Sequence, residues 1–158
     1  MVTKKENKQV FIRELSVRYK KRRVPKKTNH YIGKVANNPR VIANLFKDIQ
    51  REAVEKCFVI HLNASKIIES FQLVSMGTLF EALVSPRDVF KGALLSNAAH
   101  IIFVHNHPSG NPKPSDADRL IVKKMEAVGE IISIEVVDHI IIGIDSYYSI
   151  KQDRASHF

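Results

Sequence analysis

The sequence predicts an α/β domain in which helices flank a mixed central sheet. Apolar runs of strand length alternate along the chain with stretches whose apolar residues recur at helical spacing. Residues 101–104 (IIFV) are apolar without interruption, as expected of a strand buried on both faces. The 158 residues suit one domain, and a content of 44% hydrophobic and 26% charged residues excludes a disordered, collagenous or disulfide-scaffold chain. We expect this domain over residues 36–152, between a basic arm at 1–35 and a C-terminal tail at 153–158.

The first part of the domain is predicted to contain one helix and a hairpin. Asn37-Asn38-Pro39 is typical of a helix start, and the apolar spacing that follows predicts a helix over 39–54. The apolar positions of this helix are Ile42, Leu45, Phe46, Ile49 and Ala53. The apolar runs 57–62 and 67–76 come next, and the turn-forming residues between them predict a β-hairpin.

The second part of the domain is predicted to contain two helices and three strands. A helix begins after Ser85-Pro86, and the strand 101–104 follows it. The predicted apolar face of that helix holds Val89, Phe90, Ala93, Leu94 and Ala98. After a proline-rich loop, a further helix opens at Ser115 with an apolar stripe at Ile121, Val122, Met125 and Val128. Two last strands are predicted over 134–142 and 147–150, which completes the sheet.

The basic charge of the chain is confined to its first fifth. Residues 1–34 contain 12 Lys or Arg and 2 Glu (12 − 2 = +10), whereas residues 35–158 contain 13 basic and 14 acidic residues (13 − 14 = −1). Within this arm, residues 10–19 alternate as a short strand does, and a basic loop follows. The arm either contacts nucleic-acid phosphates without regard to sequence or is a solvated terminal segment. Both interpretations stay open.

The cysteine content and hydropathy indicate a cytoplasmic protein without a membrane partner. Cys57 is the one cysteine and cannot form an internal disulfide, so a reducing compartment is expected. No apolar stretch has the length of a membrane helix, and no apolar segment of a secretory signal follows the N-terminal basic residues. Cys57 lies in a strand-like apolar run without an activating neighbour, so it is not a candidate nucleophile.

The residues with recognisable chemistry follow the strand 101–104. His105 and His107 are two apart at a strand end, so their rings point to the same side. Asp118 lies in the first turn of the helix that the next loop leads into. Two imidazoles and one carboxylate are a set of zinc ligands that leaves a fourth position for water, as catalytic sites require. The alternative for two such histidines alone is a packing or hydrogen-bonding pair.

This segment matches a family motif at every position. The JAMM motif, H-x-H-P-x6-S-x-x-D, reads here as His105-x-His107-Pro108, six residues, then Ser115-x-x-Asp118. The chain resembles the MPN/JAB metalloprotease-like domains, and among them the bacterial RadC-like proteins most. The closer resemblance rests on HNHPSGNPKPSDAD and on Gly77-Thr78, Ser85-Pro86-Arg87, Asn97-Ala98-Ala99, Asp138-His139-Ile140-Ile141 and Tyr148-Ser149. It covers about residues 50 to 150 and implies an MPN/JAB fold with zinc held by His105, His107 and Asp118.

The resemblance also implies two catalytic residues that do not bind the metal. An upstream glutamate acts as general base and then as general acid, and the position that matches is Glu55, with Glu52 as the second candidate. Glu69 and Glu81 are expected to be exposed charges. The alternative for Glu55 is a surface carboxylate at a helix end. Ser115 is expected to donate to the developing oxyanion, to cap the helix that follows, or both.

Three further histidines are assigned no catalytic step. His139 follows Asp138 and precedes an apolar run, so we favour a structural role over a hydrogen bond to a metal ligand or a substrate contact. His61 and His100 flank apolar runs, and no chemistry is assigned to them.

Three functions are compatible with these residues. The first, which the intact ligand set favours, is a zinc-dependent metallohydrolase of the peptidase or isopeptidase type acting on a protein or peptide. The second is a DNA-associated repair or recombination accessory module that binds through residues 1–34, with the metal structural or vestigial. The third is a non-catalytic scaffold, against which the intact ligands argue. Manganese, iron or cobalt suits the same ligands as zinc, and the substrate and the oligomeric state are not predicted.

Overall fold

The computed structural model describes residues 33, 35–36, 38–77 and 84–158 of the chain. The ordered segments follow one another along the chain as helices, one short 3-10 helix (η1) and strands. Their bounds are α2 (Pro39–Leu45), η1 (Lys47–Arg51), β1 (Glu55–Leu62), β2 (Ile68–Gly77), α3 (Pro86–Leu95), β3 (His100–Asn106), α4 (Asp116–Ile131), β4 (Glu135–Gly143), β5 (Ser146–Ser149) and β6 (Arg154–His157). This confirms the predicted α/β fold with a mixed sheet.

The strands form one sheet in the order β2-β1-β3-β4-β5-β6. The pair β3–β4 is parallel, and the other neighbouring pairs are antiparallel. The apolar strand predicted over 101–104 is therefore an interior strand, with β1 on one side and β4 on the other. The predicted hairpin corresponds to β1 and β2, and the two predicted last strands correspond to β4 and β5.

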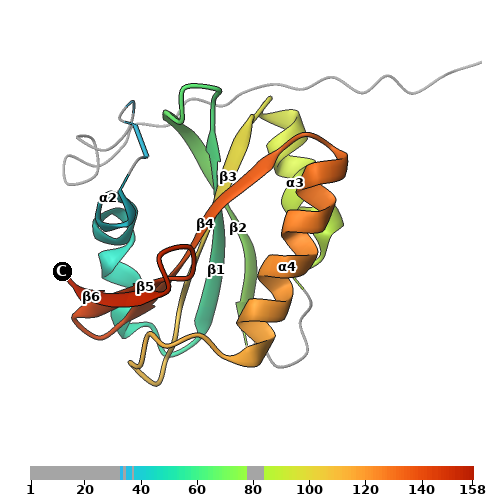
Figure 1. The fold of residues 1–158 in the computed structure, drawn as a ribbon. Helices are drawn as coiled ribbons and strands as arrows, with labels where there is room; N and C mark the ends of the chain where they lie inside the picture. The colour runs from blue at the N-terminus through green and yellow to red at the C-terminus, as the bar shows by residue number, and fades with distance from the viewer. Residues whose placement is uncertain (1–32, 34, 37, 78–83) are drawn as a thin grey trace, which may run out of the picture.

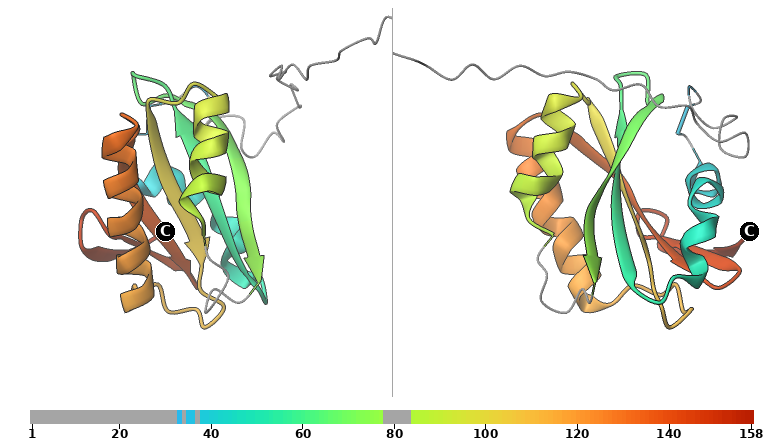
Figure 2. Two further views of the ribbon diagram at one scale, coloured as in Figure 1. Left: turned by 90° about the vertical axis from the view of Figure 1, so that its right-hand side faces the viewer. Right: turned by 180° about the vertical axis from the view of Figure 1, so that it is seen from behind.

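Helices cover both faces of the sheet. Figure 1 shows α2 on one side of the strands and the pair α3 and α4 on the other, and the two views of Figure 2 agree. Successive residues of β3 point to opposite faces because the side chains of a strand alternate. Ile102 and Val104 thus belong to the core under α2, whereas Ile101 and Phe103 belong to the core under α3 and α4.

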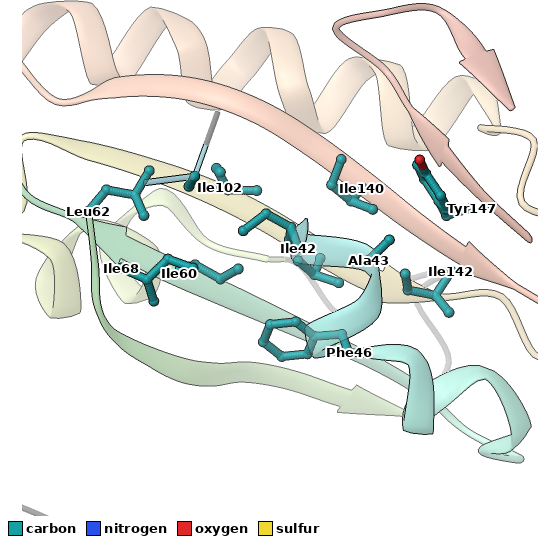
Figure 3. Packing of buried hydrophobic residues seen from close by; sticks show 12 residues of the cluster. Ile42, Ala43, Phe46, Ile60, Leu62, Ile68, Ile102, Ile140, Ile142 and Tyr147 are labelled. Carbon is teal, nitrogen blue, oxygen red and sulfur yellow. The ribbon is translucent and has the colours of Figure 1, made fainter. Parts of the chain in front are cut away.

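The core under α2 is built from aliphatic side chains of four strands. Figure 3 shows Ile42 and Ala43 of α2 close to Ile60, Ile102 and Ile140 of the sheet, and all five are buried in one cluster. Burying one isoleucine side chain stabilises the fold by about 1.5–3 kcal/mol. On the other face, α3 and α4 contribute side chains to a second buried cluster. These side chains are Val89, Phe90, Ala93 and Met125.

The helix predicted over 39–54 is wrong in its second half. The α-helix ends at Leu45, and the chain continues as η1 before β1 begins at Glu55. Ile49 still packs against the core, so the apolar spacing is satisfied by a 3-10 turn instead of an α-helix. At the end of α2, the Phe46 ring packs against Phe58 of β1 and Phe71 of β2, at centroid distances of 5.0 and 5.7 Å.

Two smaller predictions are also corrected. Leu94 of α3 is 60% exposed, and Ala98 lies after the helix, because Asn97 adopts a positive φ of 53° that ends the helical turn. The expected tail at 153–158 contains β6, which pairs with β5, and Phe158 packs against Tyr147 at a centroid distance of 5.6 Å. The strand expected at 10–19 lies outside the described residues. Among those described, no helix is long and apolar enough to cross a membrane.

Candidate metal centre

The two histidines of the motif lie at the carboxyl end of the central strand. His105 is the next-to-last residue of β3 and is 1% exposed, while His107 follows the strand and is partly open to solvent. Both rings lie on the α4 side of the sheet, as their spacing of two residues predicted. Their Nε2 atoms are 3.0 Å apart. The sequence prediction that the two rings converge is confirmed.

Asp118 completes a triangle of donor atoms. Its Oδ1 lies 3.3 Å from Nε2 of His105, and its Oδ2 lies 3.4 Å from Nε2 of His107. In tetrahedral zinc sites with bonds of about 2.0–2.1 Å, neighbouring ligand atoms are about 3.3 Å apart. The spacing of the three donors therefore fits a metal ion of this size, and zinc, with two imidazoles and a carboxylate, is a chemically suitable occupant.

The first turn of α4 holds Asp118 in place. Ser115 is the N-cap: its Oγ accepts from the backbone N–H of Asp118 at 3.1 Å. In return, Oδ2 of Asp118 accepts from the backbone N–H and the hydroxyl of Ser115, at 2.7 and 2.6 Å. This reciprocal capping box fixes the carboxylate and leaves Oδ1 facing His105. The expected capping role of Ser115 is confirmed, whereas its role toward an oxyanion stays a prediction.

The ionised carboxylate of Asp118 gives the cluster a negative charge. Burial opposes ionisation of Asp118, but hydrogen bonds to His105, His107 and Ser115 outweigh it and hold the pKa of the carboxyl well below its ordinary value. Burial lowers the pKa of His105, and Asp118 only partly offsets this effect. Burial also acts to lower the pKa of His107, but hydrogen bonds to Asp118 and the Asn111 carbonyl raise it overall. Asp118 is thus ionised at neutral pH, and its negative charge favours a cation at the three donors.

Glu55 joins this cluster from the neighbouring strand. It is the first residue of β1, and its Oε1 lies 3.3 Å from Nε2 of His105. The register brings it there, because Cys57 pairs with His105 and Glu55 precedes Cys57 by two residues. One donor atom from each of Glu55, His105, His107 and Asp118 lies within 4.8 Å of the others. The alternative of a surface carboxylate at a helix end is therefore wrong.

The other candidate glutamates are not brought to the cluster. The carboxylate of Glu52 pairs with Lys56 at 2.7 Å. Glu69 lies on β2 and accepts from the side-chain amide of Asn63 at 3.2 Å. Glu81 lies outside the described residues.

Each histidine of the cluster has a partner at its second ring nitrogen. Nδ1 of His107 donates to the backbone carbonyl of Asn111 at 2.8 Å, which leaves the Nε2 lone pair facing Asp118. Nδ1 of His105 lies 2.6 Å from Nε2 of His139, a residue of β4 that is 3% exposed. Burial and the neighbouring His105 hold the pKa of His139 well below its ordinary value, so His139 is neutral. The sequence favoured a structural role for His139 over a hydrogen bond to a metal ligand or a substrate contact; its contact with His105 matches the first of these alternatives.

Sequence reasoning missed Asn106, the residue between the two histidines. Its buried side chain points away from the rings and reaches the backbone on both sides of Glu55. Oδ1 accepts from the N–H of Lys56 at 2.9 Å, and Nδ2 donates to the carbonyl of Val54 at 3.2 Å. Asn106 thus ties the residue expected to act as the base to the strand that carries the histidines. The sequence signal that could have identified Asn106 is an asparagine at the end of an otherwise apolar strand.

The cluster opens into a pocket of about 460 Å³. Glu55, His107, Ser115 and Asp118 contribute its polar wall. The rest of the wall is small or apolar, and it is formed by Ala53, Val54, Gly77, Pro108, Ala117 and Ile121, together with Ser109. Among the lining residues that the structure describes there is no lysine or arginine.

The fold and the site together define a class of protein: an α/β domain with a candidate mononuclear metal site at the end of a central strand. The model of the RadC-like JAB domain matches residues 36–155, and the chain belongs to this family.

Relatives occur in archaea and bacteria. The chain is 38% identical over 120 residues to a UPF0758 protein of Methanosarcina acetivorans, an alignment that covers 76% of this chain and 52% of the relative. It is 42% identical over 103 residues to a UPF0758 protein of Chlorobium phaeovibrioides, covering 65% and 46% of the two chains. A UPF0758 protein of Pelodictyon phaeoclathratiforme is 44% identical over 101 residues, covering 64% and 46%. The chain spans about half the length of these relatives.

Proposed function

We propose that the protein is a zinc-dependent hydrolase that cleaves amide bonds of a peptide or protein. The observation that carries this proposal is the convergence of four donors, Glu55, His105, His107 and Asp118. All of them except the buried His105 line an apolar pocket. The three donors expected to hold the metal lie 3.0–3.4 Å from one another, as described above. Zinc bound there would polarise a carbonyl and lower the pKa of a bound water to about 7.

The residues around the donors suit acyl chemistry. Glu55 lies beside His105 and lines the pocket, so its carboxylate can take a proton from an attacking water and deliver it to the leaving nitrogen. Ser115 also lines the pocket, and its hydroxyl can turn from Asp118 to donate to the carbonyl oxygen as negative charge develops. Asn106 holds the backbone of Glu55 in position for both proton transfers.

The lining of the pocket favours an amide substrate over a phosphate ester. Hydrolysis of phosphate esters develops charge that is usually stabilised by lysine, arginine or a second metal ion. No such cation lines the described part of this pocket, and the donor cluster found among the described residues is a single one. A substrate peptide with uncharged, small or apolar side chains suits the wall formed by Ala53, Ala117 and Ile121.

To test the proposal, the zinc-loaded protein is incubated with a mixture of unmodified peptides, and the cleavage products are detected by mass spectrometry. Glu55→Gln removes the base without removing a proposed metal ligand, and Glu69→Gln on β2 is the matched control. We expect cleavage by the wild type and by Glu69→Gln, and a loss of about 100- to 10,000-fold in Glu55→Gln with zinc retained. Equal cleavage by Glu55→Gln, or no cleavage by the zinc-loaded wild type, would contradict the proposal.

The charge of residues 1–34 supports a second candidate function, binding to DNA. Their net charge of +10 contrasts with −1 for the rest of the chain, so phosphate contacts would be concentrated in this arm. Such binding would weaken steeply with salt and would not depend on sequence. Full-length protein is expected to bind a DNA duplex at low salt, and protein lacking residues 1–34 is expected not to. Equal binding by both would refute a role of the arm.

A further inference from the structure

Two buried histidines touch each other behind the metal centre. His105 on β3 and His139 on β4 point to the same face of the sheet, because Phe103 pairs with His139 and His105 lies two residues further along. Their ring centroids are 4.7 Å apart, and Nδ1 of His105 lies 2.6 Å from Nε2 of His139. The two side chains are 1% and 3% exposed. This contact is therefore a hydrogen bond shielded from water.

The other side of the His139 ring makes an aromatic contact and no hydrogen bond to a described residue. Its Nδ1 is buried and has no hydrogen-bond partner among the residues that the structure describes, and the ring packs beside Phe103 at a centroid distance of 5.5 Å. Leaving a buried polar atom unpaired is unfavourable, so an aliphatic side chain would serve better if packing were the whole role of this position. The hydrogen bond of the imidazole with His105 is what an aliphatic residue could not provide.

The proton in this hydrogen bond determines what His105 offers to a metal. If Nδ1 of His105 donates to Nε2 of His139, then Nε2 of a neutral His105 carries a lone pair directed at the other donors. If His139 donates instead, Nε2 of His105 carries the proton and points it at Asp118 and Glu55, each 3.3 Å away. A cation can bind only in the first arrangement.

We propose that His139 is a positioning residue of the metal centre, which accepts the Nδ1–H of His105 and so holds Nε2 of His105 toward the ion. This inference rests on the metal site of the proposed function. His107 has a carbonyl as partner, which can only accept and therefore fixes one tautomer. His139 can accept or donate, so the same pair suits the site with and without the ion, and the proton of this hydrogen bond lies on Nδ1 of His105 when a metal is bound.

The test measures zinc affinity by competition with a chromogenic chelator in four proteins. His139→Leu removes the acceptor, and His139→Gln restores one, because a glutamine amide oxygen can reach the place of Nε2. His61→Leu is the matched control: it removes another buried strand histidine, whose Nδ1 bonds to Ser70 instead of to the cluster. Loss of the partner of a ligand histidine lowers metal affinity about 10- to 100-fold. We expect such a loss in His139→Leu, recovery in His139→Gln, and wild-type affinity in His61→Leu.

A second measurement keeps the proposal testable if His139→Leu does not fold. Long-range ¹H–¹⁵N spectra of the zinc-loaded wild type report the tautomer of each ring, and we expect the proton on Nδ1 of both His105 and His139. A proton on Nε2 of His139, or equal zinc affinity in wild type and His139→Leu, would overturn the inference and leave the proposed function standing. Wild-type protein that binds no zinc would refute the proposed function itself.

Discussion

Replacing Asn106 by alanine should loosen the strand end that carries Glu55. The substitution removes the acceptor of the Lys56 N–H and the donor to the Val54 carbonyl, at 2.9 and 3.2 Å. A third contact, to the carbonyl of Glu52, is long at 3.5 Å and contributes little. An unpaired buried backbone group costs about 1–3 kcal/mol, and water from the adjacent pocket can satisfy part of that cost. We therefore expect a loss of about 2–3 kcal/mol in the free energy of unfolding.

The assay combines urea unfolding with amide hydrogen exchange. Exchange at Lys56 should accelerate in Asn106→Ala, because its N–H loses the acceptor. Asn63→Ala is the matched control, since Asn63 Oδ1 also accepts from backbone N–H groups, those of Ser65 and Ile67, but in a turn at the other end of β1. It should lower stability without changing exchange at Lys56. Unchanged exchange at Lys56 and less than about 0.5 kcal/mol of destabilisation in Asn106→Ala would refute the role of this side chain.

Three further predictions concern separate parts of the fold. In Gly143→Ala, the new Cβ would lie 2.5 Å from the Gly110 carbonyl oxygen, so the loop that holds His107 must shift. We expect weaker zinc binding and a loss of about 1–3 kcal/mol in the free energy of unfolding. Wild-type zinc affinity together with wild-type stability in urea would contradict this. Burial and the nearby charges of Glu55 and Asp118 raise the pKa of Cys57 to about 12. The thiol of the folded protein should therefore react with a thiol reagent far more slowly than the thiol of the urea-unfolded protein, and equally rapid labelling of the folded protein would contradict this. Burial lowers the pKa of His61 to about 4, below its unfolded value. The contribution of neutral His61 to stability is therefore full above about pH 6.5 and is lost as the pH falls toward 4, by at most about 3 kcal/mol. In urea unfolding at several pH values, His61→Gln should reduce the dependence of the free energy of unfolding on pH, and an unchanged dependence would rule out the assignment.

Elements with strong local patterns were predictable from the sequence. The apolar run of β3, the hairpin β1–β2 and the amphipathic α4 all have the periodicity of their final structure. The helix predicted over 39–54 failed because its second half is fixed by distant residues: Phe46 packs on two strands, and Asn106 binds the backbone at 52–56. The strand β6 (RASH) has no apolar alternation of its own, and its structure comes from pairing with β5.

The site was predictable only where a motif fixes the spacing. The histidines and Asp118 stand in a contiguous pattern, so their convergence followed from strand alternation and the start of α4. Glu55 was inferred from resemblance, and its place beside His105 depends on the register of β1 against β3, which the sequence does not state. The contact between His105 and His139 depends in the same way on the parallel pairing of β3 and β4, 34 residues apart.

The metal content of the purified, untagged protein tests the central claim most directly. Elemental analysis should be made on wild type, on His107→Ala, and on His157→Ala, a control in the edge strand β6. Three protein donors that converge on one position predict about one zinc ion per chain in wild type and His157→Ala, and none in His107→Ala. Absence of zinc from wild type after incubation with zinc, or equal zinc in His107→Ala, would contradict the existence of this metal centre.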